Sequence, residues 1–111
     1  MTATVNPVNM NVGDTSAAAQ GVTAFKVLLG TQSGGPYTAA ATSVALSAMT
    51  DNAGVYTVAM AALTWNPPLQ NGVTYFAVCE AENAGGLSPN SPEASFQMVS
   101  APTAPTSLSF V

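Results

Sequence analysis

The chain has 111 residues, 48% of them hydrophobic, which suits one domain with its own core and excludes a disordered tail. Charged residues make up only 5%, and Lys26 is the single cation. Nucleic-acid binding through a basic patch is therefore excluded, because almost nothing can neutralise phosphates. A surface with so few charges also lacks mutual repulsion, so we expect the chain to associate with other protein subunits or with copies of itself.

The composition also offers little for catalysis or metal binding. Cys79 is the single cysteine and the chain has no histidine, so we expect neither a disulfide nor an activated thiol. Glu80 and Glu82 would lie side by side on one open strand face, where carboxylates are usually just solvated. A catalytic pair would instead flank a cleft. Asp51 and Asn52 are too few oxygen ligands for calcium. We therefore expect no enzyme, and no catalytic, cofactor-binding or metal-binding residues.

The ends and the hydropathy of the chain bear on its location. The first twenty residues have neither a basic start nor a sustained apolar run, so we expect no export signal. No apolar stretch approaches the roughly twenty residues that a membrane helix needs, so we expect no membrane partner.

Short alternating segments separated by Gly, Pro and Asn recur along the chain, and no helical period persists for three turns. This pattern predicts an antiparallel sandwich over residues 1–100, followed by a Pro-rich arm over residues 101–111. In chain order, the expected strands cover residues 1–8, 22–29, 37–41, 42–49, 55–63, the stretch after residue 69, and 93–99. We expect residues 9–20 to form a polar, alanine-rich connection. Asp51, Asn52 and Gly54 predict a hairpin turn.

Two segments resemble fibronectin type III modules. Residues 69–86, LQNGVTYFAVCEAENAGG, place Leu69, Gly72 and Tyr75 at the spacing of the sixth strand of that family and its approach. Residues 21–38, GVTAFKVLLGTQSGGPYT, resemble its third strand and the hairpin into the next. The resemblance implies an all-β, antiparallel, immunoglobulin-like sandwich, in which the Tyr75 hydroxyl ties the incoming loop to the backbone as a tyrosine corner.

The start of the chain departs from that family. The usual module opens with a Pro-rich strand and then a second strand that ends in Trp, whereas this sequence has room for only one strand before the third. The C-terminal APTAPTSLSFV resembles the opening of such a module. We therefore expect residues 107–111 to fill the vacant first-strand position, either in their own domain or in a neighbouring subunit. The alternative is a frayed linker cut from a tandem array.

The alternation of strand side chains predicts an apolar patch on the outside of the sandwich. Leu28, Phe76 and Val78 would point outward together, and we refer to them as the outer patch. Large exposed patches often mark interfaces, although scattered apolar residues on a surface are normal. The outer patch, with Leu108 and Phe110 of the C-terminal arm, forms our candidate interface.

These observations favour a non-enzymatic structural or assembly protein. Immunoglobulin-like and fibronectin-like domains are common on bacteriophage heads and tails, so the resemblance implies a virion component, such as a capsid decoration (cement) protein or a tail accessory protein, that docks on a repeating lattice. The alternative is a spacer or a carbohydrate- or adhesion-binding module of a bacterial extracellular protein. In that alternative Trp65, Tyr37 and Tyr56 would form a sugar-stacking surface.

Overall fold

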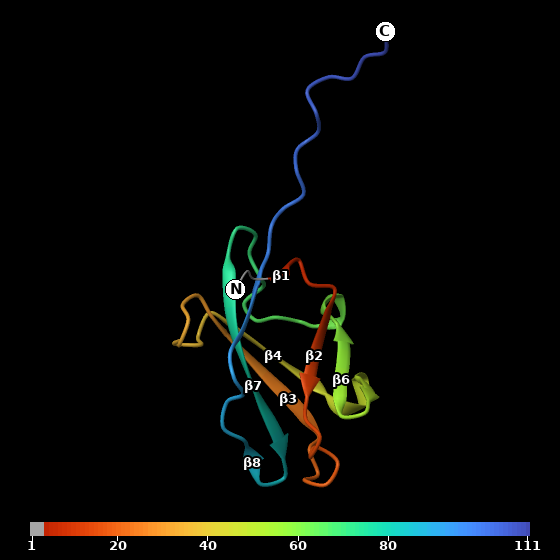
Figure 1. Cartoon of the computed structure of the whole chain (residues 1–111). Helices are drawn as coiled ribbons and strands as arrows, with labels where there is room; N and C mark the ends of the chain where they lie inside the picture. Colours follow the sequence, from red (N-terminus) through yellow and green to blue (C-terminus); the bar gives the residue numbers. More distant parts are fainter. Residues whose placement is uncertain (1–3) are drawn as a thin grey trace.

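Two β-sheets face each other in this all-β chain (Figure 1). The computed structural model describes residues 4–111. The larger sheet has the strand order β1-β9-β7-β3-β4, with β8 paired to β7, and the smaller sheet has the order β2-β6-β5. The strands are β1 (Thr4–Val5), β2 (Asn9–Gly13), β3 (Ala24–Gly30), β4 (Ala40–Ala45), β5 (Thr50–Asn52), β6 (Val55–Ala59), β7 (Thr74–Asn83), β8 (Gly86–Leu87) and β9 (Ala94–Gln97).

Strands β3 and β7 form the centre of the larger sheet. They pair antiparallel from Ala24 opposite Glu82 to Gly30 opposite Phe76. Along β3 the inward side chains of Phe25, Val27 and Leu29 are buried, and the residues between them are half-buried, which is the period of two expected for a strand with one face on the core. The core face of β3 is therefore set by its own alternation.

The core lies between the two sheets and has two parts. Near β5 and β6, Phe25 of the larger sheet contacts Tyr56 of the smaller one, with ring centroids 5.6 Å apart. At the other end Leu29 packs in a cluster with Trp65 and Tyr75. Burial of apolar side chains from both sheets holds the sheets together in a sandwich-like arrangement.

The first strands differ from the expectation. Of residues 1–8 only Thr4–Val5 forms a described strand, β1, which pairs with β9 in parallel, so the larger sheet is mixed and not purely antiparallel. Residues 1–3 of the expected strand lie outside the described residues. The stretch expected to be a connection contains β2, in which Met10 and Val12 face the core. Asn and Gly are depleted in strands, and they obscured this alternation.

Three other strands are shorter than expected. β4 ends at Ala45 and β6 at Ala59, and each is followed by a single turn of 3₁₀ helix, Leu46–Ala48 and Met60–Ala62. Leu, Ala and Met are good helix formers, which explains why the extended pattern stops there. β9 covers only Ala94–Gln97 of the expected residues 93–99, and the expected strand over 37–41 is mostly loop.

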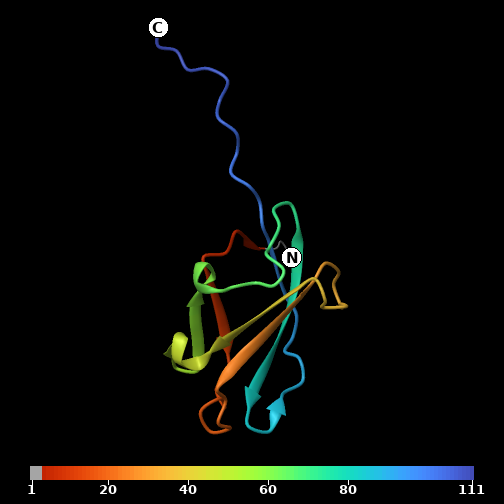
Figure 2. The same ribbon diagram turned by 180° about the vertical axis from the view of Figure 1, so that it is seen from behind.

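The C-terminal arm leaves the body after β9. Residues 100–111 are exposed and form no strand, and they account for much of the 66 Å length of the molecule (Figure 2). The single chain therefore does not place residues 107–111 beside its own β2. The expectation that the arm completes its own domain is wrong for this chain by itself.

Candidate interaction groove beside strand β2

Strand β2 pairs with β6 on one side and with no strand of residues 4–111 on the other. Before it, the Val8 carbonyl accepts the Met60 N–H at 2.8 Å, and after it the Asp14 N–H donates to the Gly54 carbonyl at 2.8 Å. Backbone hydrogen bonds of an antiparallel pair alternate along the strand, so the even-numbered residues bond toward β6. The backbone groups that point to the free edge are those of Asn9, Asn11 and Gly13.

Three adjoining hollows follow this edge and together form what we name the β2 groove. The upper hollow is about 380 Å³, the middle one about 210 Å³ and the lower one about 140 Å³. They are contiguous because Met10 lines the upper and middle hollows, and Val12 and Cys79 line the middle and lower ones. The groove separates β2 from the start of β9 and the segment before it.

The floor of the β2 groove is apolar. Met10 and Val12 of the smaller sheet face Val27, Ala77 and Cys79 of the larger one, and no charged side chain lines the upper or middle hollow. When the groove is empty, its apolar lining is in contact with water. Burial of an apolar side chain in the groove would therefore be favourable. Its chemistry suits an apolar strand.

Cys79 lies on this floor as a half-buried free thiol. Burial raises the pKa of the Cys79 thiol to about 11, and the negative charges of Asp14 and Glu80 add to the effect. The thiol is therefore protonated near neutral pH, and a protonated thiol is not a nucleophile.

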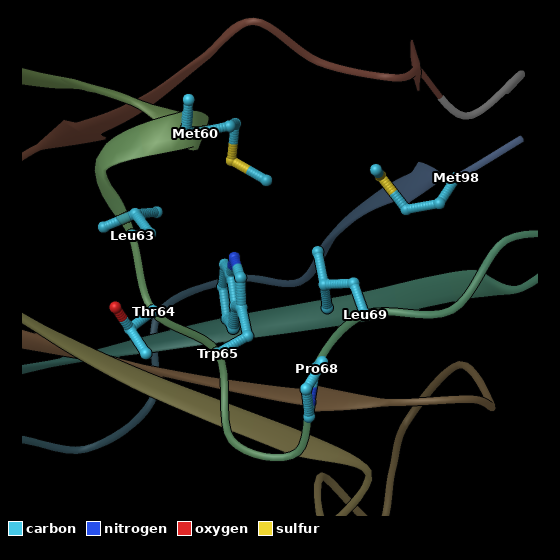
Figure 3. Close-up of a pocket in the computed structure, with 8 residues that line it drawn as sticks. Met60, Leu63, Thr64, Trp65, Pro68, Leu69 and Met98 are labelled. Carbon is cyan, nitrogen blue, oxygen red and sulfur yellow. The ribbon is translucent and has the colours of Figure 1, made fainter. Parts of the chain in front are cut away.

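Trp65 closes the upper end of the groove. The side chain is 9% exposed, and its Nε1 is the buried side-chain polar atom within residues 4–111 that lacks a hydrogen-bond partner. Trp65 also lines a separate hollow of about 440 Å³ with Met60, Leu69 and Met98. Figure 3 shows the nitrogen-bearing edge of the indole directed toward the space between Met60 and Met98. Trp65 thus contributes its ring to the upper end of the groove, while its unpaired Nε1–H points toward the separate hollow.

The residues of the expected tyrosine corner lie together at the approach to β7. The Tyr75 hydroxyl accepts the Gln70 N–H at 2.9 Å, a contact of the kind that the resemblance implies. Gly72 has φ +85°, a conformation that favours glycine, and Leu69 packs against the cluster around Trp65. These residues fix the loop and do not line the β2 groove.

The outer patch is not an exposed surface. Leu28 and Val78 are paired and point outward as predicted, but Val78 is only 4% exposed, and Leu28 and Phe76 are half-buried. The loop of residues 31–39 returns against this face, since a Cβ added at Gly30 would meet the Pro36 carbonyl oxygen. The candidate interface is corrected accordingly, because the side chains of the outer patch are buried or half-buried.

Glu93 holds this loop in place. Its carboxylate accepts the Ser33 hydroxyl at 2.7 Å, the Gly34 N–H at 2.7 Å and the Tyr37 hydroxyl at 2.8 Å. Since Glu93 directly precedes β9 and the loop joins β3 to β4, these bonds cross the outer face over β7 and β3. The Gly34, Ser33 and Tyr37 hydrogen bonds lower the pKa of Glu93 below its ordinary value.

The arm residues of the candidate interface are fully available. Leu108 is 83% and Phe110 90% exposed, and neither lies in the apolar core. The three aromatic residues expected to stack on sugars are not available in this way, since Trp65 and Tyr56 are buried and Tyr37 bonds to Glu93. The expected sugar-stacking surface is therefore not formed.

Sequence reasoning missed several residues of the β2 groove and the bonds of Glu93 to the loop of residues 31–39, which we name the loop clamp. The alternation of Met10 and Val12 between Asn residues is a usable signal for β2, whereas no local pattern marks Glu93 as the partner of a loop about 60 residues away. Within residues 4–111 no group of three Cys, Asp or Glu side chains is placed to hold a metal ion, and no helix is long and apolar enough to cross a membrane. Comparison of the chain with protein-family models, curated proteins and solved structures finds no significant match.

Proposed function

We propose that this chain is a non-enzymatic structural protein that assembles by β-strand addition, with an immunoglobulin-like, fibronectin type III-like fold whose first strand comes from outside the chain. One observation carries the proposal: β2 has a free edge with an apolar groove beside it. In a fibronectin type III-like sandwich this is where the first strand pairs with the second. Exposed strand edges template the addition of another strand, with backbone hydrogen bonds supplying affinity.

The setting that we propose is a repeating protein lattice, namely a bacteriophage virion in which the chain acts as a capsid decoration or tail accessory protein. The composition supports association, because a chain with 5% charged residues has little repulsion between copies. Many identical weak contacts on a lattice add up to stable attachment. The alternative, a spacer or adhesion module of an extracellular protein, would have no need of self-association.

The proposal is tested by light scattering on the full chain and on a chain that lacks residues 103–111. We expect an oligomer for the full chain and a monomer after truncation, because the arm supplies the added strand. The mass of the oligomer should change little in 1 M salt, since screening acts on charges and this chain has few.

A matched control keeps the arm but replaces its outward serines, Ser107→Ala and Ser109→Ala, and should leave the oligomer intact. A monomer in both the full and the truncated chain would contradict assembly through the arm and would favour the spacer module.

A further inference from the structure

We infer that the β2 groove binds residues 107–111 of a second copy of this chain, antiparallel to β2, with Phe110 beside Met10 and Leu108 beside Val12. This inference rests on the proposed function and specifies its partner, direction and register. It predicts that Phe110 fills the upper hollow near Trp65 and that Leu108 lies above Cys79.

The arm has the chemistry that the groove requires. Leu108 and Phe110 alternate with Ser107 and Ser109, so one face of an extended arm is apolar and the other polar. Both apolar side chains are exposed in the single chain, and no charge occurs after residue 100. Neither Pro102 nor Pro105 falls within residues 107–111, so every residue of this segment has the N–H that strand pairing needs.

The alternation of both strands determines the register. Residues directly opposite each other in a sheet share a face, so inward Leu108 and Phe110 must lie opposite inward Val12 and Met10. This arrangement pairs the five residues 107–111 with all five residues of β2 and places Ser109 opposite Asn11. A shift of one residue would turn the two apolar side chains to solvent, and a shift of two would carry one of them past the end of β2.

The free backbone groups fit the same register. Asn9, Asn11 and Gly13 point their N–H and C=O groups to the free edge, so they would bond to residues 111, 109 and 107. The arrows of β2 and β7 point the same way in Figure 1, and β9 is antiparallel to β7, so a strand added antiparallel to β2 would run in the direction of β9 and β1.

The path of the arm favours binding to the groove of a second copy over binding to the groove of its own chain. Asn6 bonds to both backbone groups of Val99, at 3.2 and 2.9 Å, and so fixes the arm where it leaves the body. From there the arm points away from the body, and Pro102 and Pro105 favour an extended path (Figures 1 and 2). In the proposed register the paired segment begins with Ser107 beside Gly13, at the far end of β2. The arm would therefore have to reverse its direction to reach the groove of its own chain.

The contact would join two different surfaces, the arm of one copy and the groove of the next. Each copy offers one arm and one groove, so such contacts link copies head to tail into an open chain or a closed ring, of which two copies that exchange arms form the smallest.

Disulfide crosslinking tests the register. In a Cys79→Ala background, the chain carrying Asn11→Cys and Ser109→Cys is oxidised with copper phenanthroline. Residues paired across a sheet lie at the separation that a disulfide needs. We expect a ladder of dimers and higher multimers on a non-reducing gel, with peptides 11 and 109 joined between copies when light and heavy isotope-labelled chains are mixed.

The matched control carries Asn11→Cys and Ser107→Cys, on the same face but two residues out of register, and should lose the ladder. Equal ladders in both chains would overturn the register. An oligomer without the 11–109 link would overturn this inference but leave the proposed function standing, whereas a full chain that is monomeric by light scattering would overturn both. A link formed within a single chain would overturn the choice of a second copy.

Fluorescence gives a second readout, because Trp65 is the only tryptophan and lies at the upper end of the groove. The chain that lacks residues 103–111 is titrated with the peptide TSLSFV, and we expect a saturable shift of the Trp65 emission. A peptide with serine in place of the Leu and Phe should cause no shift. Equal shifts from both peptides would overturn the roles of Leu108 and Phe110.

Discussion

On the outer face of the larger sheet, Val78 is buried, and the loop of residues 31–39 bonds to Glu93 across β7. Along the other flank, Met10 and Val12 remain half-buried beneath a groove that no described residue of the chain fills. Both flanks carry apolar side chains. The difference shows that exposure of an apolar stripe depends on whether the chain has a segment that can return over it, and the four pairs of substitutions below probe that difference.

The largest effect is expected from cavities made on the two sides of the core. Leu29→Ala removes a fully buried side chain and should lower the free energy of unfolding by about 2–5 kcal/mol. Met10→Ala acts beside a groove that is already open, so the loss should be clearly smaller in the monomeric, truncated chain. Urea denaturation of both variants measures the difference, and equal losses would mean that the groove is as well packed as the core.

A matched pair of glycines compares the covered and the open flank. Gly30→Ala places a Cβ against the Pro36 carbonyl, so the loop must shift, and we expect a loss of about 1–3 kcal/mol. Gly13→Ala meets nothing within 4 Å and should change stability by less than about 0.5 kcal/mol. Thermal unfolding of the two variants tests this, and a costly Gly13→Ala would show that something covers β2 in the free chain.

Loss of the hydrogen bond of the tyrosine corner should have a smaller effect on stability. Tyr75→Phe removes the acceptor of the partly buried Gln70 N–H and should cost about 0.5–1.5 kcal/mol. Tyr37→Phe removes an exposed bond to Glu93 and should cost less, because water replaces the lost partner. Urea denaturation measures the free energy of unfolding of the two variants. A larger loss for Tyr37→Phe would mean that the loop clamp contributes more to stability than the tyrosine corner.

The sequence predicted the parts of the molecule that are determined locally. The alternation in β3 and β7 predicted their faces, and the resemblance of Leu69, Gly72 and Tyr75 to a tyrosine corner implied the hydrogen bond that ties the approach to β7. These features depend on side-chain periodicity and on turn residues that act over a few positions.

The parts that were not predicted depend on contacts between distant segments. The outward direction of Val78 followed from alternation, but its burial did not, and neither did the contact of Glu93 with a loop that folds back against Gly30. Strand β2 was missed because Asn and Gly flank its two core residues. The arm leaves its own groove unfilled because of the position in which Asn6 holds Val99. No local sequence pattern encodes this contact.

The smallest effect is expected at Glu93, which holds the covering loop. Because hydrogen bonds lower the pKa of Glu93 in the folded chain, their contribution to stability is present above its ordinary pKa of about 4.3 and is lost as the pH falls through the lowered value. Loss of the charge should loosen the loop without unfolding the sheets. The amide proton shift of Gly34, followed by NMR from pH 6 to pH 2, reports this transition.

Glu93→Gln should abolish that transition and give a Gly34 shift that is the same at every pH, whereas Glu80→Gln, on β7 and outside the clamp, should leave the transition unchanged. A Gly34 shift that titrates in Glu93→Gln would assign the loop clamp to another group. If the clamp acts as the geometry indicates, acid should make Val78 more accessible, and the covered flank would still lack the free backbone edge that β2 offers.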